Sequence, residues 1–163
     1  MRNEADTLAA NGCSVELRAI ELDAALRAVQ AAVRHAAQLG VCVNVAVLDS
    51  AGVLAAFARM PGAPLHSIDI AIDKAYTAAS FGLPTGAWQQ ALASHSEAVR
   101  AGLVLRPRFV AFGGGIPIVE RGVRAHGARM HGARIGAIGV SGGSESQDEA
   151  IALAGLAALG AEA

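Results

Sequence analysis

Hydrophobic residues between positions 14 and 39 recur every three or four residues, which is the spacing of one face of an α-helix. The apolar positions are Leu22, Leu26, Val29, Val33 and Ala36. Gly40 follows the last of them, and glycine readily adopts the left-handed conformation that commonly ends a helix. The pattern therefore predicts a first helix within residues 14–39.

The next segment, VCVNVAVLDSAGVLAAFAR, changes to the period of β-strands. Two β-branched or apolar runs, 41–48 and 53–58, are separated by residues 49–52, which predicts a hairpin with Asp49 as a turn-forming residue. Successive residues of a strand point to opposite faces, and neither face of the first run is strongly polar. We therefore expect helices or another subunit to cover both faces.

A break at 60–64, rich in proline and glycine, precedes a second helical stripe that ends near Gly82. The stripe consists of Leu65, Ile68, Ile72, Ala75 and Ala79. The opposite face of this helix carries Asp69, Asp73, Tyr76 and Ser80. The sequence thus predicts a helix with one apolar face and one face of chemically active side chains.

The rest of the chain predicts short elements: a helix over 85–93, a loop with some helix up to 108, strands over 109–112, 116–119 and 134–140, and a helix over 144–159. Ser144 followed by Gln147 forms a capping box for the last helix.

Helices and strands do not alternate regularly, which disfavours a doubly wound parallel sheet. We expect a flexible tail over 1–13 and a single α/β (α+β) domain over 14–163, with helices packed on an antiparallel sheet.

The composition narrows the class of partner. Hydrophobic residues make up 53% of the chain and charged residues 17%, which favours a homo-oligomer. The 13 basic and 14 acidic residues include no basic run, so nucleic acid is not expected as a partner.

No apolar stretch approaches the roughly 20 residues of a membrane span. Cys13 lies in the predicted tail and Cys42 in a predicted buried strand, so we expect reduced cysteines and a cytoplasmic protein.

Three motifs occur in order along the chain: KAYTAASF, FGGGIPI and GAIGVSGG. With their surroundings they cover most of residues 41–155, and this region resembles the GlcG/HbpS family, including the C-terminal domain of PduO-type proteins. The resemblance implies a profilin-like three-layer α/β/α domain with a mainly antiparallel five-stranded sheet. It also implies oligomeric assembly and the binding of haem or a related tetrapyrrole. The chain departs from the family in a tandem repeat, RAHGA followed by RMHGA. His126 and His131 are expected on an exposed basic loop, and the alternative is a loop that contacts the ligand.

Glycine runs allow backbone N–H groups to approach an anionic ligand such as a propionate. We expect a ligand-sized hollow where the triple glycine meets the helix around Lys74 and the turn after Ser141. The candidate ligand-binding residues are Arg59, Thr77, Phe112, Gly113, Gly114, Gly115 and Ser141. The alternative is that these glycines only satisfy the steric demands of tight turns.

Haem commonly requires an axial ligand from the protein. Of the five histidines, His66 at the start of the second helix and His35 late in the first are the candidate metal ligands. For His35 a position on the helix surface is the ordinary alternative, and for His66 a solvated helix end.

Two functions from different classes remain open, together with a third possibility. The first is a haem- or tetrapyrrole-binding protein. The second is an enzyme on a small organic substrate, such as an isomerase, tautomerase or cyclase, with Asp73, Lys74, Tyr76 or His66 transferring protons. The third is a non-catalytic subunit that stabilises a partner. The chain contains no Cys-x-x-Cys pair and no His-x-x-x-His spacing, so disulfide-redox and structural-zinc functions lack support.

Overall fold

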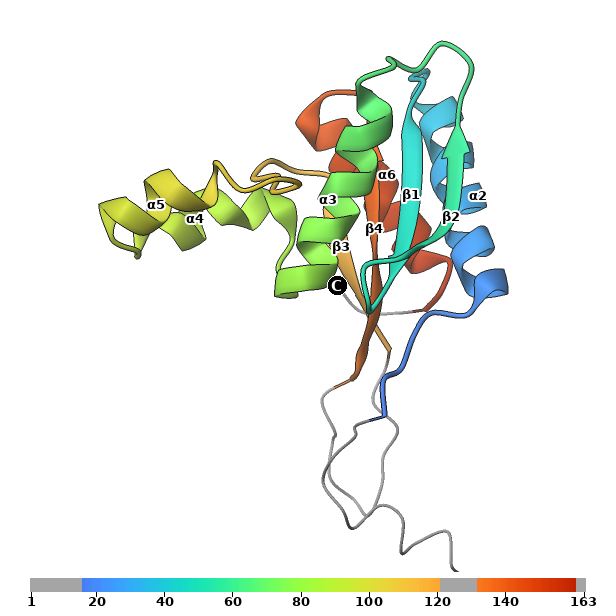
Figure 1. Cartoon of the computed structure of the whole chain (residues 1–163). Helices are drawn as coiled ribbons and strands as arrows, with labels where there is room; N and C mark the ends of the chain where they lie inside the picture. Colours follow the sequence, from blue (N-terminus) through green and yellow to red (C-terminus); the bar gives the residue numbers. More distant parts are fainter. Residues whose placement is uncertain (1–15, 121–131, 161–163) are drawn as a thin grey trace, which may run out of the picture.

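A computed structural model describes residues 16–120 and 132–160 of the chain, and these residues form three layers, helix, sheet and helix (Figure 1). The helices are α2 (Leu22–Gln38), α3 (Ser67–Phe81), the 3-10 turn η2 (Thr85–Ala87), α4 (Trp88–Ala93), α5 (Glu97–Leu103) and α6 (Glu145–Ala157). The strands are β1 (Asn44–Asp49), β2 (Leu54–Arg59), β3 (Gly115–Val119) and β4 (Arg134–Ser141). No helix in the described ranges is long and apolar enough to cross a membrane.

The sheet is antiparallel, with strand order β2-β1-β4-β3. It has four strands in the described residues, so the expectation of five is wrong for this part of the chain. The strand predicted over 109–112 is also absent. The reason is a tertiary contact, because the N–H of Val110 donates to the hydroxyl of Thr77 on α3 rather than to a neighbouring strand.

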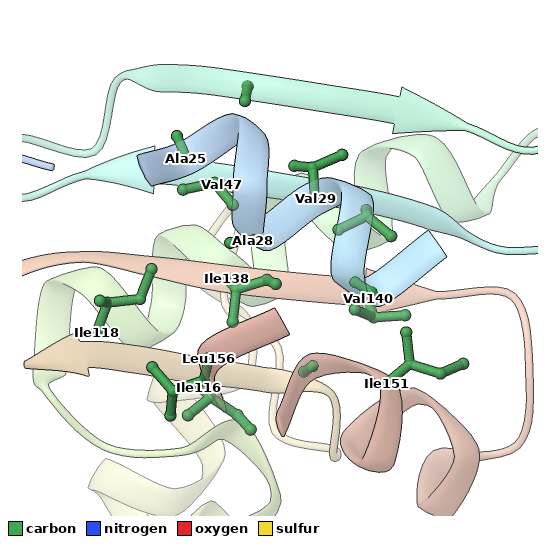
Figure 2. Packing of buried hydrophobic residues seen from close by; sticks show 14 of the residues in the cluster. Ala25, Ala28, Val29, Val47, Ile116, Ile118, Ile138, Val140, Ile151 and Leu156 are labelled. Atoms are coloured by element: carbon green, nitrogen blue, oxygen red, sulfur yellow. The ribbon is translucent and has the colours of Figure 1, made fainter. Parts of the chain in front are cut away.

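Each face of the central strands is covered by helix, as the two apolar rows of β1 predict. On one face, Val45, Val47 and Ile138 pack against α2 and α6 in the main core, which Figure 2 shows around Val29, Ile151 and their neighbours. On the other face, Ala46 and Leu48 pack against Ala71 and Ala75 of α3. Small residues on α3 allow the helix to lie close to the sheet, and the backbone of Gly139 on β4 directly faces that of Ala71.

Several local predictions are confirmed. The carboxylate of Asp49 accepts hydrogen bonds from the N–H groups of Ala51 and Val53 in the β1–β2 turn. Gly40 has a φ of 69° after α2. Ser144 and Gln147 form the capping box of α6.

Other local predictions need correction. The first helix begins at Leu22, and the first strand begins at Asn44, so Cys42 precedes the strand and is exposed rather than buried. The predicted tail, Cys13, and the repeat with His126 and His131 lie outside the described residues.

Helices α4 and α5 form an arm that projects away from the three layers (Figure 1). The arm is joined to the body at Trp88, which is buried, whereas α5 contains no buried residue. After α5 the chain returns to the body and reaches β3 through residues 104–114, passing beside α3. This return segment forms one wall of the site described below.

Candidate functional site

Helix α3 presents two chemically different sides. Its inner side carries Ala71, Lys74 and Ala78, all buried against the sheet, whereas Asp73, Tyr76 and Ser80 lie on its outer side. Gly82 ends the helix in the left-handed conformation, with a φ of 68°. The candidate residues of the KAYTAASF motif are therefore divided between two separate environments.

The inner environment is centred on Lys74, whose side chain is 1% exposed. Its Nζ donates to the carboxylate of Asp148 on α6 and to the carbonyl of Val140 on β4, each at 2.8 Å. The ring of Phe112 lies over the same nitrogen, with its centroid 4.9 Å away. Burial lowers the pKa of Lys74, and the hydrogen bond and charge of Asp148 oppose that shift. The amino group of Lys74 is thus enclosed, with two hydrogen-bond partners and an aromatic ring around it.

The triple-glycine bend meets α3 at this lysine, and the contact is close. Gly114 has a φ of 114°, and a Cβ atom there would lie 2.8 Å from Nζ of Lys74. A Cβ atom on Gly115 would lie 2.5 Å from the carbonyl oxygen of Lys74. The N–H of Gly113 donates to Glu145, and that of Gly115 to Thr85. Gly114 and Gly115 are therefore closely packed, and side chains already bind two of the three glycine amides.

A pocket of about 320 Å³ lies instead on the outer side of the same helix. Its lining comes from α3 and from the return segment after α5: Tyr76, Thr77, Ser80, Phe81, Leu103, Arg106, Pro107, Arg108 and Phe109. This volume is at the small end of the range of ligand sites, roughly 300–1,000 Å³. The two arginines are the only charged residues of the lining.

Two aromatic rings, Phe81 and Phe109, contribute to the lining of the pocket. Phe81 and Phe109 meet edge to face with centroids 6.0 Å apart. Trp88 packs edge-on behind both, at 4.8 Å from Phe81 and 4.9 Å from Phe109. These rings fix the return segment against the end of α3 and give the pocket rigid apolar walls.

Arg108 closes the pocket toward the middle of α3. Its guanidinium carbon lies 3.6 Å from the ring centroid of Tyr76, and its Nε donates to Asp73 at 2.8 Å. The Tyr76 ring also contacts the β1–β2 turn, where a Cβ atom on Gly52 would lie 2.9 Å from Cε2 of the ring. Tyr76 is therefore held between a turn and a cation.

Of the residues selected from the sequence, Tyr76 and Thr77 line the pocket, and Asp73 touches it through Arg108. The remaining candidates lie elsewhere. Lys74, Phe112 and the three glycines surround the inner cluster, and Ser141 is buried at the end of β4. Arg59, at the end of β2, donates to the carbonyl of Ala63.

The two candidate metal ligands do not converge. His66 is exposed at the N-terminus of α3, and His35 is partly buried on α2, on the opposite face of the sheet. Because a sheet and its side chains separate these helices, a single iron cannot be coordinated by both.

Sequence reasoning missed the return segment, above all Arg106, Arg108 and Phe109. The dense run Arg-Pro-Arg-Phe was the available signal, since two cations beside an aromatic residue are unusual in a chain with so few charges. Its position opposite Phe81 depends on the path of the arm, which no local pattern predicts.

The family model described as haem-degrading protein HbpS-like matches residues 20–157. The chain belongs to the HbpS-like family. Both layers of helices, the sheet and the whole pocket lining fall within the matched region. The family resemblance seen in the sequence is thus confirmed.

Relatives of this HbpS-like chain include an uncharacterised 15.0 kDa protein of Citrobacter freundii, encoded between dhaT and dhaS. It is 33% identical over 85% of this chain and 91% of its own length. The corrinoid adenosyltransferase PduO of Salmonella typhimurium is 34% identical over 80% of this chain, which spans only 36% of PduO. Among solved structures, a PduOC:haem complex has a TM-score of 0.75 and 30% identity, over 88% of this chain and 97% of that one.

Proposed function

We propose that this protein binds haem or a closely related tetrapyrrole in the pocket between α3 and the return segment. One observation carries the proposal: aromatic walls and two arginines line the same pocket. A tetrapyrrole with propionate groups requires both features, an apolar surface for the ring and cations for the carboxylates. The solved haem complex of a relative from the same family supports this choice of ligand.

The pocket residues fit such a ligand in distinct ways. Phe81 and Phe109 offer aromatic surface, and Arg106 and Arg108 offer positive charge at the rim. Tyr76 is the only lining residue of a type that serves as an axial ligand to haem iron, because the lining contains no histidine, cysteine or methionine. Bound haem would supply a redox-active iron, while these side chains would exclude water from one face of the ring.

A substitution that fills the pocket with a larger side chain tests whether haem binds there. Ser80 is exposed and lines the pocket, so Ser80→Trp places an indole where the ring would bind without disturbing the core. Haemin titration of the wild type should give a saturable Soret shift, and Ser80→Trp should weaken binding about tenfold or more. Ser146→Trp, an equivalent change at an exposed serine on α6, should bind as the wild type does.

His66→Ala and His35→Ala should also retain binding, since neither histidine lines the pocket. Non-saturating haemin binding by the wild type, or unchanged affinity in Ser80→Trp, would overturn the proposal.

We further propose that the protein is a homo-oligomer. Its arm contains two helices of 6 and 7 residues, and helices this short are not stable in water without packing. Val99, Val104 and Leu105 of the arm and its return segment are exposed, Leu105 by 81%. A second copy of the chain would cover these exposed residues. It would also cover the part of a tetrapyrrole ring that extends beyond a pocket of about 320 Å³.

A further inference from the structure

Arg108 has an unusual backbone conformation. Its φ is 64°, and it is the only residue other than glycine with a positive φ in the described part of the chain. The left-handed region crowds the Cβ atom of any side chain, so the surrounding structure must hold Arg108 there. Glycine would fit this position without strain, yet the position carries the largest cation available.

Thr77 holds the backbone around Arg108 from two directions. Its hydroxyl donates to the carbonyl oxygen of Arg108 at 2.9 Å and accepts from the N–H of Val110 at 3.0 Å. Thr77 is 1% exposed, so water does not compete for these bonds. Asp73 and Tyr76, one turn or less away on the same helix, then fix the guanidinium. Three residues of α3 thus determine where the side chain of Arg108 points.

The contacts with Asp73 and Tyr76 leave the two terminal nitrogens of the Arg108 guanidinium available to a ligand. Asp73 uses Nε, and the two terminal nitrogens form no hydrogen bond to any residue that the structure describes. The side chain lines the pocket and is 40% exposed. Arginine presents its terminal N–H groups as a planar fork that matches a carboxylate. Arg106 lines the same pocket without any side-chain hydrogen bond in the described residues, so it lacks this preorganisation.

We propose that Arg108 is the carboxylate anchor of the pocket and that Thr77 is its positioning residue. The inference rests on the proposed function and makes it more specific, because it assigns the ligand a carboxylate placed at one edge of an otherwise apolar ring. A preorganised arginine binds such a group with less loss of side-chain entropy than a flexible one. Because the net charge of Asp73, Arg106 and Arg108 together is positive, an anion is attracted to the rim.

Comparing haemin with its dimethyl ester, which lacks both carboxylates, tests the anchor separately from the pocket. Arg108→Gln should weaken binding of haemin about tenfold or more, the usual effect of losing a charged hydrogen bond, and leave binding of the ester within about twofold. Arg100→Gln removes a matched exposed arginine of α5 that does not line the pocket, and it should change neither affinity.

The positioning role requires a second comparison. Thr77→Val removes the hydroxyl while keeping the shape, and it should weaken binding of haemin more than binding of the ester. Thr77→Ser retains the hydroxyl and should restore the preference for haemin. Equal losses for both ligands in Thr77→Val would contradict a positioning role.

The failures of the two proposals are distinguishable. If Ser80→Trp blocks both ligands while Arg108→Gln affects them equally, the pocket is correct and the anchor is wrong. If Ser80→Trp blocks neither ligand, the proposed function itself is wrong.

Discussion

At the scale of single residues, the motif KAYTAASF serves two purposes within four positions. Lys74 turns inward and joins α3 to β4 and α6, whereas Tyr76 and Thr77 face the pocket. A buried ion pair gains little over apolar packing, but loss of one partner leaves the other charge unpaired. Lys74 is therefore a structural residue in this geometry, and its bonded ammonium has no route to a ligand in the pocket.

Breaking the ion pair between Lys74 and Asp148 should destabilise the folded protein. Lys74→Met leaves the carboxylate of Asp148 buried with only the N–H of Gly143 as a hydrogen-bond donor. We expect the free energy of unfolding to fall by about 3–5 kcal/mol. The double variant Lys74→Met/Asp148→Leu should recover at least half of the loss. Urea denaturation measures both values, and a single-variant cost below about 1 kcal/mol would show that the pair is not buried as described.

The same lysine predicts a pH dependence. Burial lowers its pKa from 10.5, so between the lowered value and 10.5 the unfolded chain holds a proton that the folded chain has released. The free energy of unfolding contributed by Lys74 should therefore rise with pH across that range. Denaturation of the wild type and Lys74→Met at several alkaline pH values gives the difference, which should grow as the pH rises. A difference that shrinks would indicate that Asp148 outweighs burial.

Residue type and spacing predicted part of the site and could not predict the rest. Tyr76 was identified because it lies on the polar face of the predicted helix, and Thr77 because it follows on the part of the helix expected to meet the triple glycine. The same reasoning could not separate them from Lys74, because the direction of a lysine at the border of a helix face depends on whether a carboxylate faces it. That carboxylate, Asp148, lies 74 residues away in the sequence. Arg108 acquires its role only through contacts with α3.

At the scale of elements, local signals predicted the hairpin, the helices and their ends. Asp49, Gly40 and Ser144 act through neighbours within five residues, so their turns and caps can be read from short segments. The strand predicted over 109–112 fails because tertiary bonding overrides local propensity. Phe109 and Val110 are apolar and suited to a strand, yet Val110 bonds to Thr77 and Phe109 packs against Phe81 and Trp88. The element that the sequence mispredicted is thus the wall of the pocket.

At the scale of the whole molecule, the three layers form a closed core, and α5 at the end of the arm contains no buried residue. The hydrophobic composition of the chain is consistent with a further contact surface, because Val99 of the arm and Val104 and Leu105 of the return segment are exposed. The arm and the pocket are connected, since residues that leave α5 return as the pocket wall. Assembly and ligand binding should therefore influence each other.

The oligomer can be tested through the exposed apolar residues where the arm meets the return segment. Sedimentation equilibrium of the wild type should give a mass at least twice that of one chain. Leu105→Glu introduces a charge at the most exposed large hydrophobic residue of the described chain and should shift the protein toward the monomer. Leu39→Glu, the same change at the end of α2, is the matched control and should leave the mass unchanged. A monomeric wild type, or equal effects of both variants, would contradict an interface at the arm.

A crystal structure of the protein with haemin tests the central claim most directly. We expect the ring against Phe81 and Phe109, with a propionate oxygen about 2.7–2.9 Å from a terminal nitrogen of Arg108. A ring bound beside His35, or at the triple-glycine bend with the pocket between α3 and the return segment empty, would contradict the proposed site.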